Sequence, residues 1–376
     1  MFNLPPAQAS ARGMLRQGKT QDFTEKAAAI AAGIAEEGLR YVSDSAPGFS
    51  RKRTGGAFSY YDKNDKRITD PTIVERIRSI GIPPAYESVW ICPSPNGHIQ
   101  ATGLDARGRK QYRYHPKWRE LRDQTKYERI LEFATRLPRL RRRIGTDMRR
   151  KALPRQKLLA TIASLLDKTL IRVGNHEYAA TNKSFGLTTL RRKHAAISNG
   201  ALQLEFTGKS GKRWNLQIND KRIISVVKRC AEIPGHDLFK YIDDNGSVCT
   251  ISSGDVNGYI KAAMGDDFTA KDFRTWAGTV LTAAALVKCG TESTPARAKR
   301  DVTAVIAAVA KQLGNTPAIC RKCYVHPEIL DAYMTGDLIK MMNRQPGARF
   351  KRRYAKLSVS EIRVLAFLEK RLMTAK

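Results

Sequence analysis

The periodicity of the apolar residues changes near residue 150, and this change constrains the fold more than any other feature of the sequence. Between about Leu39 and Trp118, short runs of strand-forming residues alternate with residues that favour turns. The runs are Phe58–Tyr61, Val89–Cys92, His98–Thr102 and Lys110–Tyr114. Asn96-Gly97 and Ala106-Arg107-Gly108 suit turns because Asn and Gly tolerate positive φ. This region is therefore predicted to be rich in β-strands.

One short helix is expected inside this β-rich region. Asp70 is a good N-cap residue, and Pro71 suits the first helical turn. The apolar residues that follow fall on one helical face: Ile73, Val74, Ile77 and Ile80.

After residue 153 the apolar residues recur at helical spacing, which predicts buried helix faces. The three clearest stripes are Leu158 to Leu170, Phe273 to Ala284, and Val302 to Leu313, the last ended by Gly314 in a C-cap role. A single hairpin interrupts them, because alternating residues 202–206 and 214–218 flank the turn 208–211. Near the end, Ser358 and Glu361 form a capping box before a last helix.

These patterns predict an α+β fold with a small β-rich N-terminal domain and a larger, mainly α-helical domain. The predicted divisions are a leader or helix over 1–38, the β-rich domain over 39–118, a basic helical connector over 119–152, and the larger domain over 153–376, which carries the candidate catalytic residues discussed below.

The charge balance indicates a polyanionic partner. The chain carries 67 Lys and Arg residues against 35 Asp and Glu residues, a formal net charge of +32. Such a surface gains free energy when it displaces the counterions of a nucleic acid. The alternative is a ribosome-associated or merely basic protein. Within the connector, we expect Arg141, Arg142 and Arg143 to contact phosphates, although most charge runs form solvated helix faces.

Several classes of protein are disfavoured by what the sequence lacks. No stretch approaches the ~18–20 apolar residues that span a bilayer, and the first residues do not resemble a secretory signal. The six scattered cysteines suit reduced thiols, as in a cytosol. Together with the nucleic-acid partner that the charge indicates, this leads us to expect a cytoplasmic, nucleoid-associated protein. Cys320 and Cys323 form a CxxC, but no second pair accompanies them, so no zinc site is expected.

Two motifs that suggest cofactors also fail. Gly208-Lys209-Ser210 resembles the end of a phosphate-binding P-loop, but Gln203 stands where that pattern requires glycine. The acidic pairs Asp243-Asp244 and Asp266-Asp267 could suggest a metal-dependent nuclease, but no third ligand stands at a suitable spacing. We therefore expect no metal and no cofactor.

What remains fits phosphoryl transfer by protein groups alone. That chemistry needs a nucleophile, an acid for the leaving oxygen, and fixed cations around the transition state. Four segments supply these residue types: Ile171 to Asn175, Phe206 to Lys209, Lys271 to Thr275, and Leu313 to Tyr324.

In these segments the chain resembles the poxvirus-type and bacterial type IB DNA topoisomerases, over about residues 39–350 and in the same order. IRVGNHEYAATNKSFGLTTLRRKH (171–194) resembles the family's first-arginine region. The hairpin Gly208-Lys209 matches its lysine, KDFRTW its second arginine, and LGNTPAICRKCYVHP its nucleophile region. ATGLDARGRKQYRYH (101–115) resembles the part of the N-terminal domain that faces DNA.

The resemblance implies a role for each matching residue. Tyr324 attacks phosphorus to give a 3′-phosphotyrosyl bond, and Lys209 protonates the departing 5′ oxygen. Arg172 and Arg274 hold the non-bridging oxygens, and Asn315 donates a further hydrogen bond where poxvirus members usually carry His. The implied DNA contacts are Gln111, Tyr112, Tyr114 and Tyr178. The implied protein is a monomer that clamps double-stranded DNA and relaxes supercoils without ATP or metal.

Two alternatives remain at the level of sequence. A tyrosine recombinase or integrase shares this chemistry on a related fold, but it typically carries HxxR where this chain has Lys271 before Arg274. Its N-terminal region is also usually helical. A non-enzymatic DNA-binding protein is consistent with the charge alone.

Overall fold

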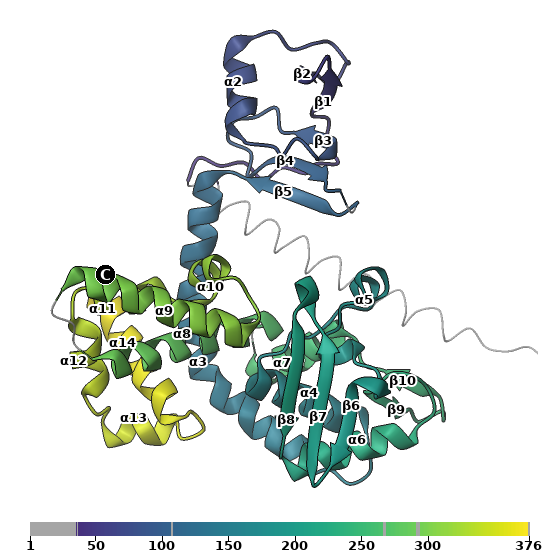
Figure 1. Ribbon diagram of the computed structural model, residues 1–376, viewed down its shortest axis with the longest axis vertical. Helices are drawn as coiled ribbons and strands as arrows, with labels where there is room; N and C mark the ends of the chain where they lie inside the picture. Colours follow the sequence, from purple (N-terminus) through teal and green to yellow (C-terminus); the bar gives the residue numbers. More distant parts are fainter. Residues whose placement is uncertain (1–34, 36, 107, 266–267, 291–293, 375–376) are drawn as a thin grey trace, which may run out of the picture. The chain divides into compact units, whose positions relative to one another are not determined.

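The computed structural model describes residues 35, 37–106, 108–265, 268–290 and 294–374. The predicted leader or helix over 1–38 therefore lies almost wholly outside the described residues, as do Arg107 and the pair Asp266-Asp267. The chain divides into two compact units, Met1–Lys126 and Tyr127–Lys376, which are drawn together in Figure 1. The predicted N-terminal β-rich region and the mainly helical remainder are both confirmed.

The first unit contains a five-stranded antiparallel sheet in the order β2-β1-β3-β4-β5. Its strands are β1 (Phe49–Thr54), β2 (Ala57–Tyr61), β3 (Glu87–Ile91), β4 (Ile99–Leu104) and β5 (Lys110–Tyr114). Helix α2 (Pro71–Ser79) forms as predicted, because the Asp70 side chain accepts a hydrogen bond from the Thr72 N–H and Pro71 opens the first turn. Its buried Ile77 packs with residues of the sheet, among them Val89 and Ile91.

Helix α3 (Pro116–Asp147) runs unbroken across the boundary between the two units. The predicted connector over 119–152 is helical as far as Asp147, and from Tyr127 onward it belongs to the larger unit. Phe133, Leu137 and Leu140 are fully buried in that unit's core. The division between the two compact units lies after Lys126, within this helix.

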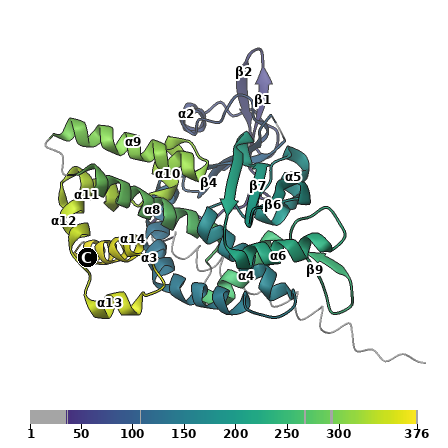
Figure 2. The same ribbon diagram turned by 60° about the horizontal axis from the view of Figure 1, so that its bottom comes forward.

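The larger unit carries one three-stranded sheet, in the order β6-β7-β8, beside several helices. The strands are β6 (Ala195–Ser198), β7 (Ala201–Thr207) and β8 (Arg213–Ile218), and the predicted hairpin is β7 with β8. Helix α4 (Arg155–Thr169) and helix α6 (Lys221–Glu232) pack together, and α6 contacts β7 (Figure 2). The short helix α5 (His176–Asn182), the hairpin of β9 (Lys240–Ile242) and β10 (Val248–Thr250), and α7 (Ser253–Met264) complete this part.

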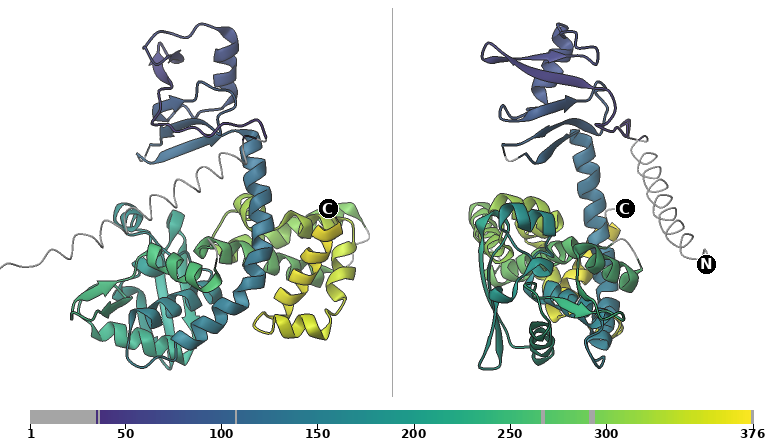
Figure 3. Two further views of the ribbon diagram at one scale, coloured as in Figure 1. Left: turned by 180° about the vertical axis from the view of Figure 1, so that it is seen from behind. Right: turned by 90° about the vertical axis from the view of Figure 1, so that its right-hand side faces the viewer.

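Helix α8 (Ala270–Cys289) is the central element of the remaining helices. It packs against α9 (Pro295–Leu313), α10 (Pro317–Tyr324), α11 (Pro327–Met334), α12 (Asp337–Asn343) and α14 (Val359–Thr374). Helix α13 (Ala348–Arg353) precedes α14, whose start is capped reciprocally by Ser358 and Glu361 as predicted. Figure 3, seen from behind, shows these C-terminal helices on the side of the unit away from the β6–β8 sheet.

The predicted apolar stripes form the core of the larger unit. The buried side chains of α4, α8 and α9 belong to one continuous cluster. No helix among the described residues has the length and apolar composition needed to cross a bilayer.

Candidate active site

Tyr324 is the last residue of α10, and the packing of that helix end fixes its backbone. Thr316 caps the start of the helix by accepting a hydrogen bond from the Ile319 N–H, and Pro317 occupies the first turn. At the other end, the Tyr324 carbonyl lies so close to Gly278 of α8 that a Cβ on that glycine would overlap it. The half-buried Tyr324 ring lies against the guanidinium of Arg274, whose central carbon is 5.1 Å from the ring centroid.

Arg274 lies one turn before Gly278 on α8 and is only 3% exposed. Its Nη1 donates to the Leu170 carbonyl and its Nη2 donates to the Leu313 carbonyl at 2.6 Å, while its buried Nε has no partner among the described residues. Burial and the neighbouring charge of Arg172 lower the pKa of Arg274. An arginine side chain starts from such a high pKa that it stays charged in proteins. The helix therefore presents a fixed, desolvated cation beside the Tyr324 ring.

Arg172 and Asn315 are joined by a direct hydrogen bond. Nη2 of Arg172 donates to Oδ1 of Asn315 at 2.5 Å. Asn315 follows Gly314, which ends α9 in the left-handed conformation (φ 64°), and its N–H donates to the Ala310 carbonyl at 2.9 Å. The buried Nδ2 of Asn315 has no hydrogen-bond partner among the described residues. This amide is therefore oriented by its oxygen and has a donor available.

The loop that carries Arg172 is held by backbone hydrogen bonds. The Leu187 N–H donates to the Arg172 carbonyl at 2.9 Å, and the Thr188 N–H donates to the Val173 carbonyl at 2.7 Å. Gly174 has φ 103° and lies close to the hydroxyls of Thr188 and Thr189, so a larger residue does not fit there.

Lys209 lies in the turn between β7 and β8, where the sequence predicted it, and its side chain is exposed. The turn is closed by a hydrogen bond from the Gly208 N–H to the Lys212 carbonyl at 2.7 Å. Within the described residues, Lys209 makes no hydrogen bond or ion pair. The structure thus brings Tyr324, Arg274, Arg172 and Asn315 together. Lys209 lies on a separate hairpin, whose Trp214, next to the turn, packs beside Gly314.

The predicted DNA contacts lie at two places. In the first unit, Tyr112 and Tyr114 point to the same face of β5 and their rings stack at 5.9 Å, with Tyr112 exposed. Gln111 points to the opposite face of the strand, where its amide donates to Asp105 at 3.0 Å. In the larger unit, Tyr178 is half-buried on α5, whose Asn175 cap accepts the Tyr178 N–H.

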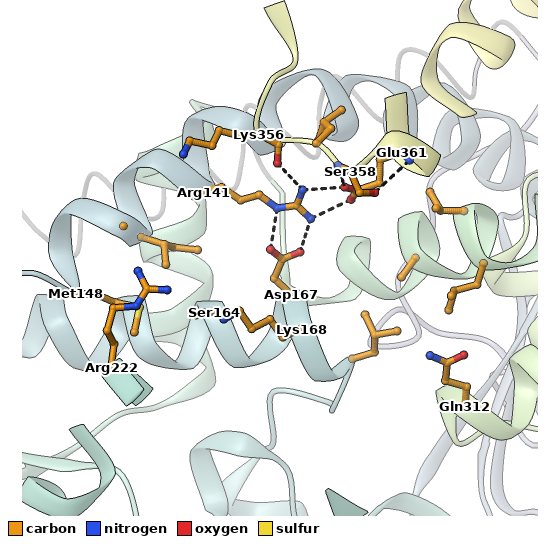
Figure 4. A pocket seen from close by; sticks show the side chains of 17 residues that line it. Arg141, Met148, Ser164, Asp167, Lys168, Arg222, Gln312, Lys356, Ser358 and Glu361 are labelled. Atoms are coloured by element: carbon orange, nitrogen blue, oxygen red, sulfur yellow. Dashed lines mark hydrogen bonds and ion pairs between the residues drawn. The ribbon is translucent and has the colours of Figure 1, made fainter. Parts of the chain in front are cut away.

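The prediction that Arg141 contacts phosphate needs correction. All five of its N–H groups are engaged inside the larger unit, by both oxygens of Asp167, both oxygens of Glu361 and the Lys356 carbonyl (Figure 4). An arginine with no free donor on its guanidinium is suited to holding α3, α4 and α14 together. The adjacent Arg142 and Arg143 are exposed, and Arg143 makes a 3.4 Å ion pair with Asp147.

The sequence analysis missed three residues that hold α10, the helix that ends at Tyr324. Gly278 admits the Tyr324 carbonyl, and the Thr279 hydroxyl accepts the His326 N–H at 3.1 Å. On α3, the Tyr127 hydroxyl donates to the Lys322 carbonyl at 2.9 Å, and its ring packs 4.9 Å from the His326 ring. A carbonyl in the last turn of a helix has no partner inside the helix, so Tyr127 satisfies a group that α10 leaves open. Of the three, Gly278 alone leaves a signal in the sequence, as an isolated glycine inside the apolar stripe of α8.

No group of three or more His, Cys, Asp or Glu side chains in the described part of the chain is arranged to hold a metal ion. The two cysteines of the CxxC differ in environment. Cys320 is buried, which raises the pKa of its thiol to about 11, and Cys323 is half-buried next to Tyr324. A thiol with such a pKa is protonated near neutral pH.

Known proteins match both units. A family model described as the catalytic core of eukaryotic DNA topoisomerase I matches residues 115–346, and one described as the N-terminal domain of bacterial DNA topoisomerase IB matches residues 57–105. A similar protein from Acanthamoeba polyphaga mimivirus, named DNA topoisomerase 1B, is 34% identical over 295 residues, which cover 76% of this chain and 87% of the relative. Together with the arrangement around Tyr324, these matches establish that the chain belongs to the type IB DNA topoisomerase family.

Proposed function

We propose that this protein relaxes supercoiled duplex DNA by cutting one strand with Tyr324, allowing the strand to rotate, and resealing it. The observation that carries the proposal is the arrangement of a tyrosine against one buried arginine, with a second arginine bound to an asparagine nearby. The mimivirus relative carries the name of the same activity.

In the cleavage step, the Tyr324 oxygen forms a bond to phosphorus and the bond from phosphorus to the 5′ oxygen breaks. The phenol proton leaves to solvent, and Lys209 supplies the proton that the 5′ oxygen gains. The products are a 3′-phosphotyrosyl bond and a free 5′ hydroxyl. The reverse step restores the strand, and because the ester bond is exchanged and not hydrolysed, no ATP is required.

The extra negative charge on the non-bridging oxygens needs fixed positive charge. Arg274 offers a cation whose position is set by two backbone carbonyls. Arg172 offers a second cation, oriented by the Asn315 carbonyl oxygen. Asn315 adds its available Nδ2 donor. Groups held in place before the reaction stabilise a transition state without the cost of reorganisation, so we propose that the reaction needs no metal ion.

We further propose that the protein acts as a monomer whose two units clamp duplex DNA, and that it associates with the nucleoid. The formal charge of +32 supports strong attraction to phosphates. Gln111, Tyr112 and Tyr114 would contact DNA from the first unit, and Tyr178, Arg142 and Arg143 from the larger one.

Plasmid relaxation in EDTA without ATP tests this function. We expect negatively and positively supercoiled plasmids to relax in steps under these conditions. Activity that requires ATP, or that disappears in EDTA and returns with a divalent metal, would refute the proposed mechanism. Production of joined or exchanged DNA molecules at two specific sites would instead indicate a recombinase.

A further inference from the structure

The buried side chain of Trp214 links two parts of the candidate site that are far apart in the sequence. Trp214 lies on β8, directly across from Phe206 on β7, and the two rings stack at 6.2 Å with an interplanar angle of 8°. The indole is 8% exposed. Together with Phe206 it therefore forms the apolar end of the hairpin next to the turn that carries Lys209.

Two glycine backbones lie against the indole of Trp214. A Cβ on Gly208 would lie 2.7 Å from its Nε1, and a Cβ on Gly314 would lie 2.9 Å from its Cζ2. Both distances are shorter than ordinary carbon contacts, so the indole fits only because both positions are glycine. Gly208 precedes Lys209, and Gly314 precedes Asn315. One rigid ring thus separates the backbone of the proposed acid from the backbone of a phosphate-binding residue.

The two sides of the indole are not equally constrained by other contacts. On one side, Asn315 is also held by its N–H bond to Ala310 and by Arg172. On the other side, the turn contains Ser210 and Gly211 at positive φ (62° and 75°), and the exposed Lys209 side chain makes no hydrogen bond or ion pair within the described residues. A second link, from Lys212 Nζ to the Lys311 carbonyl, is longer at 3.3 Å. Loss of the indole would therefore release the hairpin turn more than it would release Asn315.

We propose that Trp214 is a positioning residue that sets the place of Lys209 relative to the scissile phosphate. This inference rests on the proposed function, in which Lys209 protonates the 5′ oxygen. Tryptophan suits the role because its ring is large and has only two rotatable bonds, so packing against two backbones fixes its orientation. A displacement of about 1 Å in a reacting group can cost on the order of 10²-fold in rate.

The test compares Trp214→Leu on two suicide substrates in single-turnover cleavage. One carries oxygen at the bridging 5′ position and the other carries sulfur, which leaves as a thiolate without an acid. We expect Trp214→Leu to slow cleavage of the oxygen substrate by roughly 10- to 100-fold. On the sulfur substrate, whose leaving group needs no acid, we expect cleavage to slow by less than about threefold. Equal slowing on both substrates would overturn the proposal.

A double variant separates this inference from the proposed role of Lys209. If Trp214 acts through Lys209, then adding Trp214→Leu to Lys209→Ala should cause no further slowing on the oxygen substrate. Additive slowing would overturn the inference whether or not Lys209 is the acid. If sulfur does not rescue Lys209→Ala itself, the acid assignment fails, while the double variant still decides the role of Trp214.

Two further variants guard against simple unfolding. Trp214→Phe keeps an aromatic ring and should show the same substrate dependence with a smaller oxygen effect. Gly208→Ala adds one methyl group against the indole and should also slow only the oxygen substrate. Its matched control is Gly258→Ala on α7, where an added Cβ meets no atom within 4 Å. Thermal unfolding of each variant shows whether the unit remains folded. An oxygen-specific defect in Gly258→Ala of the same size would count against the proposal.

Discussion

The hydrogen bond between Arg172 and Asn315 allows a quantitative prediction. Asn315→Ala removes the acceptor for Arg172 and also the available Nδ2 donor. The loss of one preorganised donor typically costs about 10²–10³ in rate. We expect the two losses together to slow cleavage by about 10², at the lower end of this range, because Arg172 and Arg274 keep their full charge near the phosphate oxygens.

Coupling between the two residues follows from the same geometry. A hydrogen bond that involves a charged group contributes about 1.5–3 kcal/mol, which corresponds to roughly 10- to 150-fold in rate. In an Arg172→Ala background, Asn315→Ala should therefore slow cleavage by only about tenfold or less, far below its effect alone. The assay is single-turnover cleavage with the parent, both single variants and the double variant. Fully additive effects would refute the claim that Asn315 orients Arg172.

Asn315→His separates the acceptor role from the donor role. A neutral imidazole can accept from Arg172 with one nitrogen and donate with the other, whereas an imidazolium can only donate. The variant should stay active, and its cleavage rate should rise with pH as the ring loses its proton. Its pKa should lie at or below about 6.5, because the charges of Arg172 and Arg274 favour the neutral ring. A rate that falls over the same range, between about pH 5 and 9, would show that only the donor matters.

Four other predictions test residues outside the catalytic set. Arg141→Met should lower the free energy of unfolding by about 3–5 kcal/mol in chemical denaturation, since it leaves Asp167 and Glu361 unpaired. It should leave the salt dependence of DNA binding unchanged, whereas Arg142→Gln should reduce the slope of log K against log salt by about 0.9 if Arg142 contacts a phosphate. Burial raises the pKa of Glu361, but the bonds from Arg141 outweigh it and hold that pKa below its usual range. The stabilisation from Glu361 is thus complete above about pH 4.3 and is lost as the pH falls, and Glu361→Gln should flatten acid unfolding there. Tyr127→Phe should slow cleavage by up to about fivefold, because it removes one neutral hydrogen bond to the Lys322 carbonyl. The control is Tyr259→Phe, which removes a buried hydrogen bond to Asp147 and should not slow cleavage.

The parts of the fold with clear periodicity could be predicted from the sequence. The stripes of α4, α8 and α9, the hairpin of β7 and β8, and the cap of α2 all follow from local patterns. Strand β1 could not be predicted, because FSRKRT has no alternation of apolar and polar residues. Its place in the sheet depends on pairing with β2 and β3, and on the guanidinium of Arg51, which donates to the carbonyls of Ile82, Pro83 and Tyr86.

The site was predictable to the extent that its residues lie in recognisable segments. Arg172, Lys209, Arg274, Asn315 and Tyr324 each stand in such a segment, and their roles are proposals. Arg141 shows the limit of this reasoning. It lies in a run of arginines that looks uniform, and only the tertiary structure reveals that Asp167 and Glu361 surround it. Tyr127 and Trp214 act through packing between distant segments, so no local pattern distinguishes them from core residues.

The central claim is that Tyr324 forms a covalent bond to DNA, and denaturant trapping measures this directly. The parent protein is mixed with end-labelled duplex DNA in EDTA without ATP, stopped with detergent, and resolved on a denaturing gel. We predict a protein–DNA adduct attached at a 3′ phosphate, which proteolysis reduces to a peptide that contains Tyr324. Tyr324→Phe removes only the nucleophilic oxygen, so it should bind the same DNA and yield no adduct. An adduct with Tyr324→Phe, for example through Cys323, would contradict the account.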